Sequence, residues 1–322
     1  MPAKPGAPSP EDILVGGQAV LEGVMMRTPY AYAVAVRRAD GSVNVKREAV
    51  ERLSGLWKPL SWPVVRGFAV LIQSLVLGLR TLNFSFNVVM SDLESDTEKE
   101  KKNESDKGGD FLPILFSMIA AGAVAVFLFI LAPLGITTWL KGYFPSIQNW
   151  VVFNLVDGVI RVLFFLAYIL FISRMRDIRR VFQYHGAEHK VVYTWEAGEN
   201  LTVENARKKS TLHPRCGTSF LLFVMVVSIA VFSVFKFHAF WAIFLSRVVL
   251  IPLIAGLSYE LIRLSAPRCQ RGVFRIVVMP GLALQRITTK EPSDDQLEVA
   301  IIALKEALEL DGIKAREAQA AA

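Results

Sequence analysis

Two pairs of long apolar segments dominate the pattern of hydrophobic and polar positions along the chain. The first pair covers residues 111–140 and 151–173, and the second covers residues 217–235 and 239–264. Each segment of the first pair is long enough to cross about 30 Å of hydrocarbon at about 1.5 Å per residue. Because only short connections join the members of each pair, the pattern predicts two membrane hairpins, 111–173 and 217–264, and therefore about four transmembrane helices.

The region before these spans has a different pattern. Residues 1–14 are rich in proline and alanine and are expected to be a disordered lead, followed by an N-terminal segment at 15–62. Within that segment, apolar residues alternate around an Asp40-Gly41 turn, which favours a β-hairpin. The fold class expected is therefore mainly α, a polytopic helical membrane protein with a small N-terminal β-hairpin region on the cytoplasmic side.

Basic residues determine the expected orientation. The loop at 174–216 holds nine Lys and Arg residues and the tail at 265–322 holds more, so the positive-inside rule places both, and both termini, in the cytoplasm. A crossing by the apolar segment 63–90 would put six basic residues outside. We therefore interpret that segment as an interfacial or re-entrant helix, followed by a charged linker at 91–110.

The tail contains one further pattern. Apolar residues recur at helical spacing from residue 294 to residue 310, which predicts an amphipathic helix that lies on the membrane or on another part of the protein. The members of this stripe are Leu297, Ile301, Leu304 and Leu308.

Composition agrees with a membrane protein. Hydrophobic residues make up 53% of the 322 positions, with 21 Phe, and two cysteines are too few for a disulfide framework. No cleavable signal peptide is expected at the start. The net charge of +7 would suit nucleic acid, but the basic residues lie beside apolar spans without a nucleic-acid-binding motif. The expected partners are the lipid bilayer and, through it, membrane proteins or lipids.

Candidate chemistry is concentrated in the loop between the two hairpins. His185 and His189 are four residues apart, so on a helix their imidazoles share one face, and Glu188 projects beside them. This H-x-x-E-H order is the inverted zinc-peptidase arrangement, in which two histidines bind the metal and the glutamate takes a proton from water. It predicts a divalent metal, zinc in the first place, with Glu188 as the catalytic residue.

The remaining ligands have several candidates. His213 and Cys216 are three residues apart, and Glu260 is expected at the cytoplasmic end of the last span. Four ligands from His185, His189, His213 and Cys216 would make a closed structural site, whereas three ligands leave a position for water. The sequence leaves this choice open, as it does the simpler possibility that the histidines only make capping bonds or surface pairs.

Other polar residues are secondary candidates. Asp157 and Arg161 lie four apart within a predicted span, where an ion pair that locks the helices is favoured over a proton path. Gln18 and Glu22 are either within reach of the metal loop or part of a glycine-rich turn in which Glu22 pairs with Arg27.

Three motifs carry a family resemblance. The segments GGQAVLEGVMMR, FQYHGAEHKVVYTWEAGE and STLHPRCGTSF resemble the YqhQ-like family of bacterial multipass membrane proteins. The resemblance implies a location in the bacterial inner membrane and a metal-dependent enzyme of unknown activity, with the metal at His185, His189, His213 and Cys216 beside Glu188.

Two functional hypotheses follow. The first is a metal-dependent hydrolase at the cytoplasmic membrane face. The second is a non-catalytic membrane scaffold or assembly factor in which zinc has a structural role. Neither the substrate nor the oligomeric state is indicated by the residues.

Overall fold

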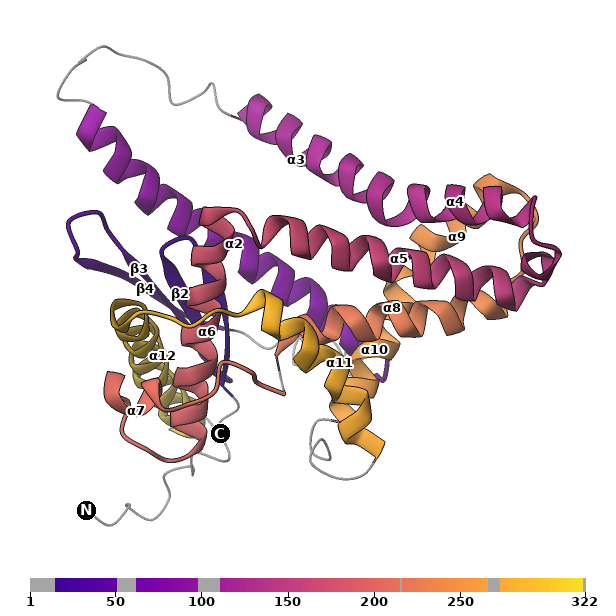
Figure 1. The fold of residues 1–322 in the computed structure, drawn as a ribbon. Helices are drawn as coiled ribbons and strands as arrows, with labels where there is room; N and C mark the ends of the chain where they lie inside the picture. Colours follow the sequence, from indigo (N-terminus) through magenta and orange to yellow (C-terminus); the bar gives the residue numbers. More distant parts are fainter. Residues whose placement is uncertain (1–14, 51–61, 98–110, 215, 266–272, 321–322) are drawn as a thin grey trace.

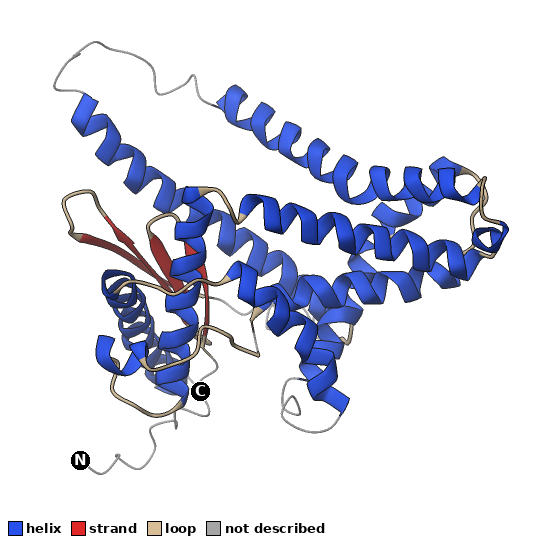
Figure 2. Cartoon of the chain, in the orientation of Figure 1, coloured by secondary structure: helices blue, strands red, loops and turns tan. Residues whose placement is uncertain are grey.

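The structure is a computed structural model and describes residues 15–50, 62–97, 111–214, 216–265 and 273–320. A small β-sheet and three helices form one end of the molecule, and long helices extend from it to the opposite end (Figures 1 and 2). The expected lead at 1–14 and most of the linker at 91–110 lie outside the described residues, although the helix before the linker continues to Thr97.

The sheet is an antiparallel meander in the order β1-β2-β3-β4. Its last two strands, β3 (Ala31–Arg37) and β4 (Val43–Ala49), confirm the predicted hairpin, and Gly41 in the turn has a φ of 86°. The first two strands, β1 (Gly16–Val20) and β2 (Gly23–Arg27), form a second hairpin that the sequence pattern did not predict.

Helices cover both faces of this sheet. One face packs on α6 (Arg176–Glu196), α7 (Val203–Arg207) and α12 (Asp294–Ala320), and the other packs on α2 (Val65–Thr97). The central strand β3 therefore reads AYAVAVR, with nearly every residue buried instead of every second one. The predicted stripe of α12 lies in this core, so α12 packs on the protein.

The long helices form two hairpins, as the apolar pattern predicted. The first comprises α3 (Phe111–Val126), a π-helical turn at Phe127–Leu131 and α4 (Ala132–Lys141), and it returns through α5 (Trp150–Ile172). The second comprises α8 (Gly217–Val234), α9 (Phe240–Val249) and α10 (Ile251–Ser265). Both short connections lie at the end of the molecule far from the sheet (Figure 1).

Length and composition identify the helices that could cross a membrane. Among the described residues, three helices qualify, at Val65–Asp92, Ile119–Lys141 and Trp150–Ile172. The pair α9 and α10, bent by 47°, adds a fourth if the two cross as one broken span, and α8 contributes a shorter apolar stretch at Phe220–Val234. The expected number of about four spans is consistent with this finding.

The structure changes the interpretation of α2. A re-entrant segment would break and reverse, whereas α2 is one continuous helix of 33 residues. Leu77 and Val88 pack on the sheet, while an apolar stripe on α2 stays exposed. The stripe consists of Val65, Ile72, Leu75, Val76, Leu79, Leu82 and Phe86. A continuous helix does not fit the re-entrant alternative, whereas the interfacial alternative stays a prediction for a helix that covers the sheet with one face and is apolar on the other.

Candidate metal centre

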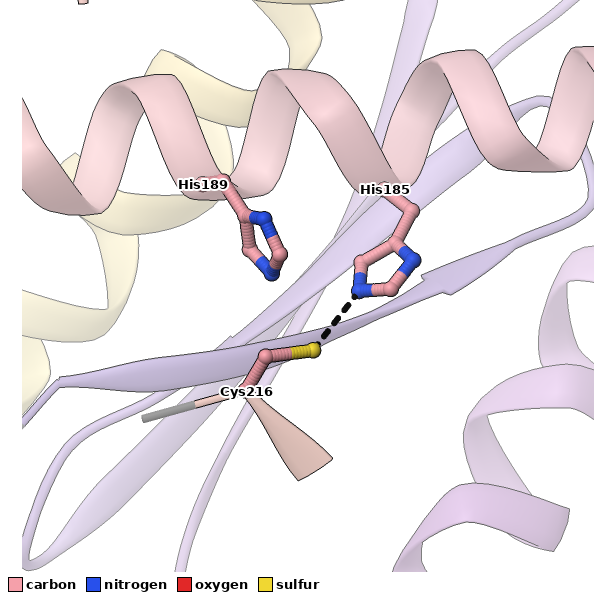
Figure 3. Close-up of side chains that lie close together, drawn as sticks. All are labelled: His185, His189 and Cys216. Atoms are coloured by element: carbon pink, nitrogen blue, oxygen red, sulfur yellow. Dashed lines mark hydrogen bonds between the residues drawn. The ribbon is translucent and has the colours of Figure 1, made fainter. Parts of the chain in front are cut away.

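Three side chains that the sequence singled out converge between α6 and the start of α8. His185 and His189 lie on one face of α6, and Cys216 is the N-cap residue of α8 (Figure 3). One ligand atom from each lies within 4.8 Å of the other two, an arrangement that could hold a metal ion. His185 Nε2 and Cys216 Sγ are 3.2 Å apart. Tertiary structure thus brings together residues separated by 31 positions.

Hydrogen bonds fix which nitrogen of each histidine faces this cluster. His185 Nδ1 is 2.9 Å from the carbonyl oxygen of Thr288, and His189 Nδ1 is 2.5 Å from that of Thr211. A carbonyl oxygen only accepts, so Nδ1 is the donor in both rings, and Nε2 is the nitrogen left to face the cluster. The Nε2 atom of His189 is buried and has no hydrogen-bond partner among the described residues.

Glu188 lies on the same helical face, between the two histidines. Its side chain is buried and meets β1, where the Gly17 amide donates a hydrogen bond to the carboxylate. Burial raises the pKa of Glu188, while the nearby His185 and the Gly17 amide oppose this rise. A Cβ atom on Gly17 would lie 3.0 Å from the Glu188 Cγ and Cδ atoms, so glycine allows the strand to approach the carboxylate.

The connection between α11 (Val273–Thr288) and α12 runs close against α6. A Cβ atom on Gly186 would lie 2.1 Å from the Lys290 carbonyl oxygen, so only glycine fits here. The Lys290 amide in turn donates to the Phe182 carbonyl oxygen at 2.9 Å. This close contact places the Thr288 carbonyl on His185. The sequence contained one signal for it, a glycine inside a helix, where glycine costs about 1 kcal/mol relative to alanine.

His213 has a different place from the one predicted. Its ring is buried, and its Nε2 atom is 3.3 Å from a Glu196 carboxylate oxygen. It does not belong to the group of ligand atoms formed by the two other histidines and Cys216. The backbone of His213 is bound on both sides by Gln285, through bonds of 2.7 and 2.8 Å. This clamp holds the loop so that Cys216 reaches the cluster, a role that sequence reasoning did not assign to Gln285.

Glu260 is also placed elsewhere. Its two carboxylate oxygens accept hydrogen bonds of 2.6 and 2.5 Å from the Arg66 guanidinium on α2. The structure thus gives Glu260 a partner in the contact between α10 and α2 and leaves it out of the candidate ligand group. Glu260, which was expected as a possible third ligand, is thus bound to α2 and not grouped with His185 and His189.

Two cavities border the cluster. The larger has a volume of about 350 Å³ and is lined by His185, Glu188, Cys216, residues 17–19 of β1 and residues of α6 and α8. The smaller, about 110 Å³, is lined by His189, His213 and Glu188 together with residues 15–17. The candidate ligands and Glu188 are therefore open to small molecules or water beside β1.

The two N-terminal candidates, Gln18 and Glu22, lie at different places in the structure. Gln18 lines the larger cavity, with its carboxamide against Gly78 of α2. Glu22 pairs with Arg180 of α6 and lies 3.4 Å from the Tyr184 hydroxyl, which donates to it. The alternative pairing of Glu22 with Arg27 is not what the structure records, because Arg27 bonds to Gln73 of α2. Glu22 thus contacts α6, but it lines a third cavity, about 410 Å³ in volume, that does not include the two histidines or Cys216.

Asp157 and Arg161 form the ion pair that their spacing suggested. Arg161 Nη2 is 2.7 Å from Asp157 Oδ2, and Arg247 of α9 approaches the same oxygen at 3.2 Å. Arg247 also donates to Asn154 Oδ1 at 2.7 Å and stacks over Phe232 of α8. This buried polar cluster joins α5, α8 and α9 and is separate from the histidines.

Comparison with known proteins identifies the family. The model of a family described as "Protein of unknown function (DUF1385)" matches residues 62–310. The chain belongs to this family. It is also 34% identical over 302 residues to the "Uncharacterized protein YqhQ" of Bacillus subtilis (strain 168), covering 92% of this chain and 93% of the relative. The expected resemblance is thereby confirmed. No solved structure matches the chain.

Proposed function

We propose that this protein is a membrane-associated, metal-dependent hydrolase in which His185, His189 and Cys216 hold a divalent ion. The observation that carries the proposal is the convergence of two imidazole nitrogens and one sulfur, with both Nδ1 atoms bound to backbone carbonyls. Metal-binding histidines usually have such a partner on the second nitrogen. The buried Nε2 of His189 has no hydrogen-bond partner within the described ranges, and a bound ion would satisfy it.

The donor set favours zinc and a reactive role. Imidazole nitrogen together with thiolate sulfur suits this borderline-soft ion. Three protein ligands leave a position open for water or substrate, whereas a structural zinc site is closed by four. His213 would be the fourth ligand of a closed site, but it is paired with Glu196.

The residues around the cavity have different roles in the proposed hydrolysis. When bound, the ion would polarise the bond under attack and lower the pKa of a water molecule. Glu188 accepts the proton of the attacking water and delivers it to the leaving group. The Gly17 amide orients the carboxylate, and the Thr288 and Thr211 carbonyls keep the two imidazoles in the tautomer that binds metal.

The location proposed is the inner membrane of a bacterium. Four arginines directly follow α5, at positions 174, 176, 179 and 180. The positive-inside rule then puts α6, the sheet and both termini on the cytoplasmic side. In this orientation the cluster lies at the cytoplasmic membrane face, because Cys216 caps the inner end of α8.

Metal content tests this proposal. We expect the detergent-solubilised protein to hold one zinc per chain by mass spectrometry, and to lose it in His185→Ala, His189→Ala and Cys216→Ala. His213→Ala and Glu260→Ala should keep the metal, and His238→Ala is the matched control because His238 is exposed in the distant turn. Glu188→Gln should also keep it. Wild-type protein without metal would overturn the proposal.

The second candidate function is a non-catalytic scaffold or assembly factor with a structural zinc. The burial of His213 beside His189, with ring centroids 5.7 Å apart, favours it, since His213, His189 and Cys216 line the same small cavity. This candidate predicts that His213→Ala loses the metal together with Cys216→Ala, and that the protein then fails to fold.

A further inference from the structure

Strand β1 has a free edge. It is the first strand in the order β1-β2-β3-β4, and among the residues that the structure describes it pairs only with β2. Along an antiparallel pair, the backbone groups of alternate residues bond to the neighbour, and those of the residues between them point away. A two-residue turn joins Val20 to Gly23, so this pair is hydrogen-bonded, and Gly17 and Ala19 point outward. The bond from the Gly17 amide to Glu188 agrees with this direction.

This free edge runs along the candidate metal centre. Residues 15–17 line the smaller cavity and residues 17–19 line the larger one, in both cases together with Glu188 and Cys216. Gly16 and Gly17 are exposed and have no side chains, so another backbone can come close. Within the described part of the chain, the outward amide and carbonyl of Ala19 have no hydrogen-bond partner.

We propose that the substrate is an extended polypeptide segment that pairs with the outer edge of β1, an inference that rests on the hydrolase function proposed above. The segment would bond to the outward groups of Ala19 and to the Gly17 carbonyl, as peptides that add a strand to a sheet do. Its own carbonyl groups would then lie along the cavity that contains His185 and Glu188.

The reaction at this edge is peptide-bond hydrolysis. The water oxygen forms a bond to the carbonyl carbon, and the carbon–nitrogen bond breaks. The proton that Glu188 takes from water passes to the departing nitrogen, so the products are a carboxylic acid and an amine. No oxidant or further reactant is required.

An apolar acyl chain fits the edge less well. The edge presents the amide and carbonyl of Ala19 and the carbonyl of Gly17, a pattern that another backbone complements. An alkyl chain would displace water from the Ala19 amide and carbonyl without replacing its hydrogen bonds, which costs free energy. The edge therefore discriminates in favour of a peptide even though the cavity has apolar walls.

Two probes of equal length test whether the site prefers a peptide or an acyl chain. Full-length protein loaded with Co²⁺ is titrated with acetyl-trialanine hydroxamate and with undecanoyl hydroxamate, and binding is followed by the visible spectrum of the metal. Both probes carry the same metal-binding group, so the ratio of their dissociation constants isolates the contribution of the backbone. We expect the peptide to bind roughly tenfold more tightly, an ordinary gain for a few added hydrogen bonds.

A matched pair of proline substitutions tests the edge itself. Ala19→Pro removes the outward amide of β1 without breaking a bond to β2, because edge strands tolerate proline. Ala49→Pro makes the same change on β4, the opposite edge, where Ala49 is exposed and the bond from the Val50 amide to the Tyr30 carbonyl shows that Ala49 points outward. Ala19→Pro should abolish the preference for the peptide, and Ala49→Pro should keep it.

Hydrogen exchange gives an independent readout in the wild-type protein. The peptide probe should slow amide exchange in residues 15–22, and the alkyl probe should not. Equal or tighter binding of the alkyl probe, or a preference that survives Ala19→Pro, would overturn the inference and leave the hydrolase standing. Binding of neither probe to metal-loaded protein would overturn the open metal site and the inference together.

Discussion

Two polar clusters, one beside the sheet and one among the long helices, differ in how their groups are satisfied. In the buried polar cluster, the Asp157 carboxylate is paired with two guanidiniums, although Asp157 Oδ1 and the Nε atoms of Arg161 and Arg247 have no hydrogen-bond partner among the described residues. In the candidate metal centre, two imidazole nitrogens and a sulfur face one another with one hydrogen bond among them, between His185 Nε2 and Cys216 Sγ, and no group of opposite charge in the described ranges pairs with all three. The first cluster therefore holds helices together, and the second is suited to bind an added ion.

The largest expected effect on stability comes from a substitution that breaks the buried polar cluster. Asp157→Asn leaves two buried guanidiniums without their carboxylate, and removing one partner of a buried ion pair costs about 3–5 kcal/mol. Denaturant unfolding in detergent measures the loss. Asp295→Asn, at an exposed position of the first turn of α12, should change the free energy of unfolding by less than about 1 kcal/mol. Metal content per folded chain should stay at the wild-type value in both variants.

Removal of the metal tests the other cluster. A chelator should lower the stability of the wild-type protein by about 3 kcal/mol if the ion is present at about a hundred times its dissociation constant. His189→Ala should unfold at the same temperature with and without the chelator. A chelator effect that persists in His189→Ala would place the ion at another site.

Gly186→Ala probes the hydrogen bonds behind the ligands. The added methyl group meets the Lys290 carbonyl and should push the connection to α12, with the Thr288 carbonyl, away from His185. Loss of such a partner lowers metal affinity by about 10–100-fold. Competition with a chromogenic chelator measures the affinity. Gly312→Ala, where a Cβ atom meets nothing within 4 Å, is the control and should bind metal as the wild type does.

The smallest expected effect on stability is that of a substitution at Glu22, which lies outside the candidate metal centre. Its pair with Arg180 is half-exposed, so Glu22→Gln should cost less than about 1 kcal/mol. Metal content and affinity for hydroxamates should not change. A loss of metal in this variant would show that the candidate centre extends to the third cavity, which Glu22 lines.

The amino-acid sequence by itself determined the parts of this protein that depend on local spacing. The apolar runs predicted the two helical hairpins, the Asp40-Gly41 turn predicted β3 and β4, and the spacing of His185 and His189 put them on one helical face. Each of these features depends on the spacing of residues within one segment, and not on the contacts of that segment with the rest of the protein.

The tertiary structure alone decided which distant groups meet. It selected Cys216 over His213 and Glu260 beside the two histidines, since Gln285 holds the loop before α8 and Arg66 binds Glu260. It also paired the glycine-rich residues before β3 into a hairpin whose free edge lies along the metal centre. Such contacts join residues far apart in the chain, and their free energy depends on packing and hydrogen-bond geometry that no local pattern records.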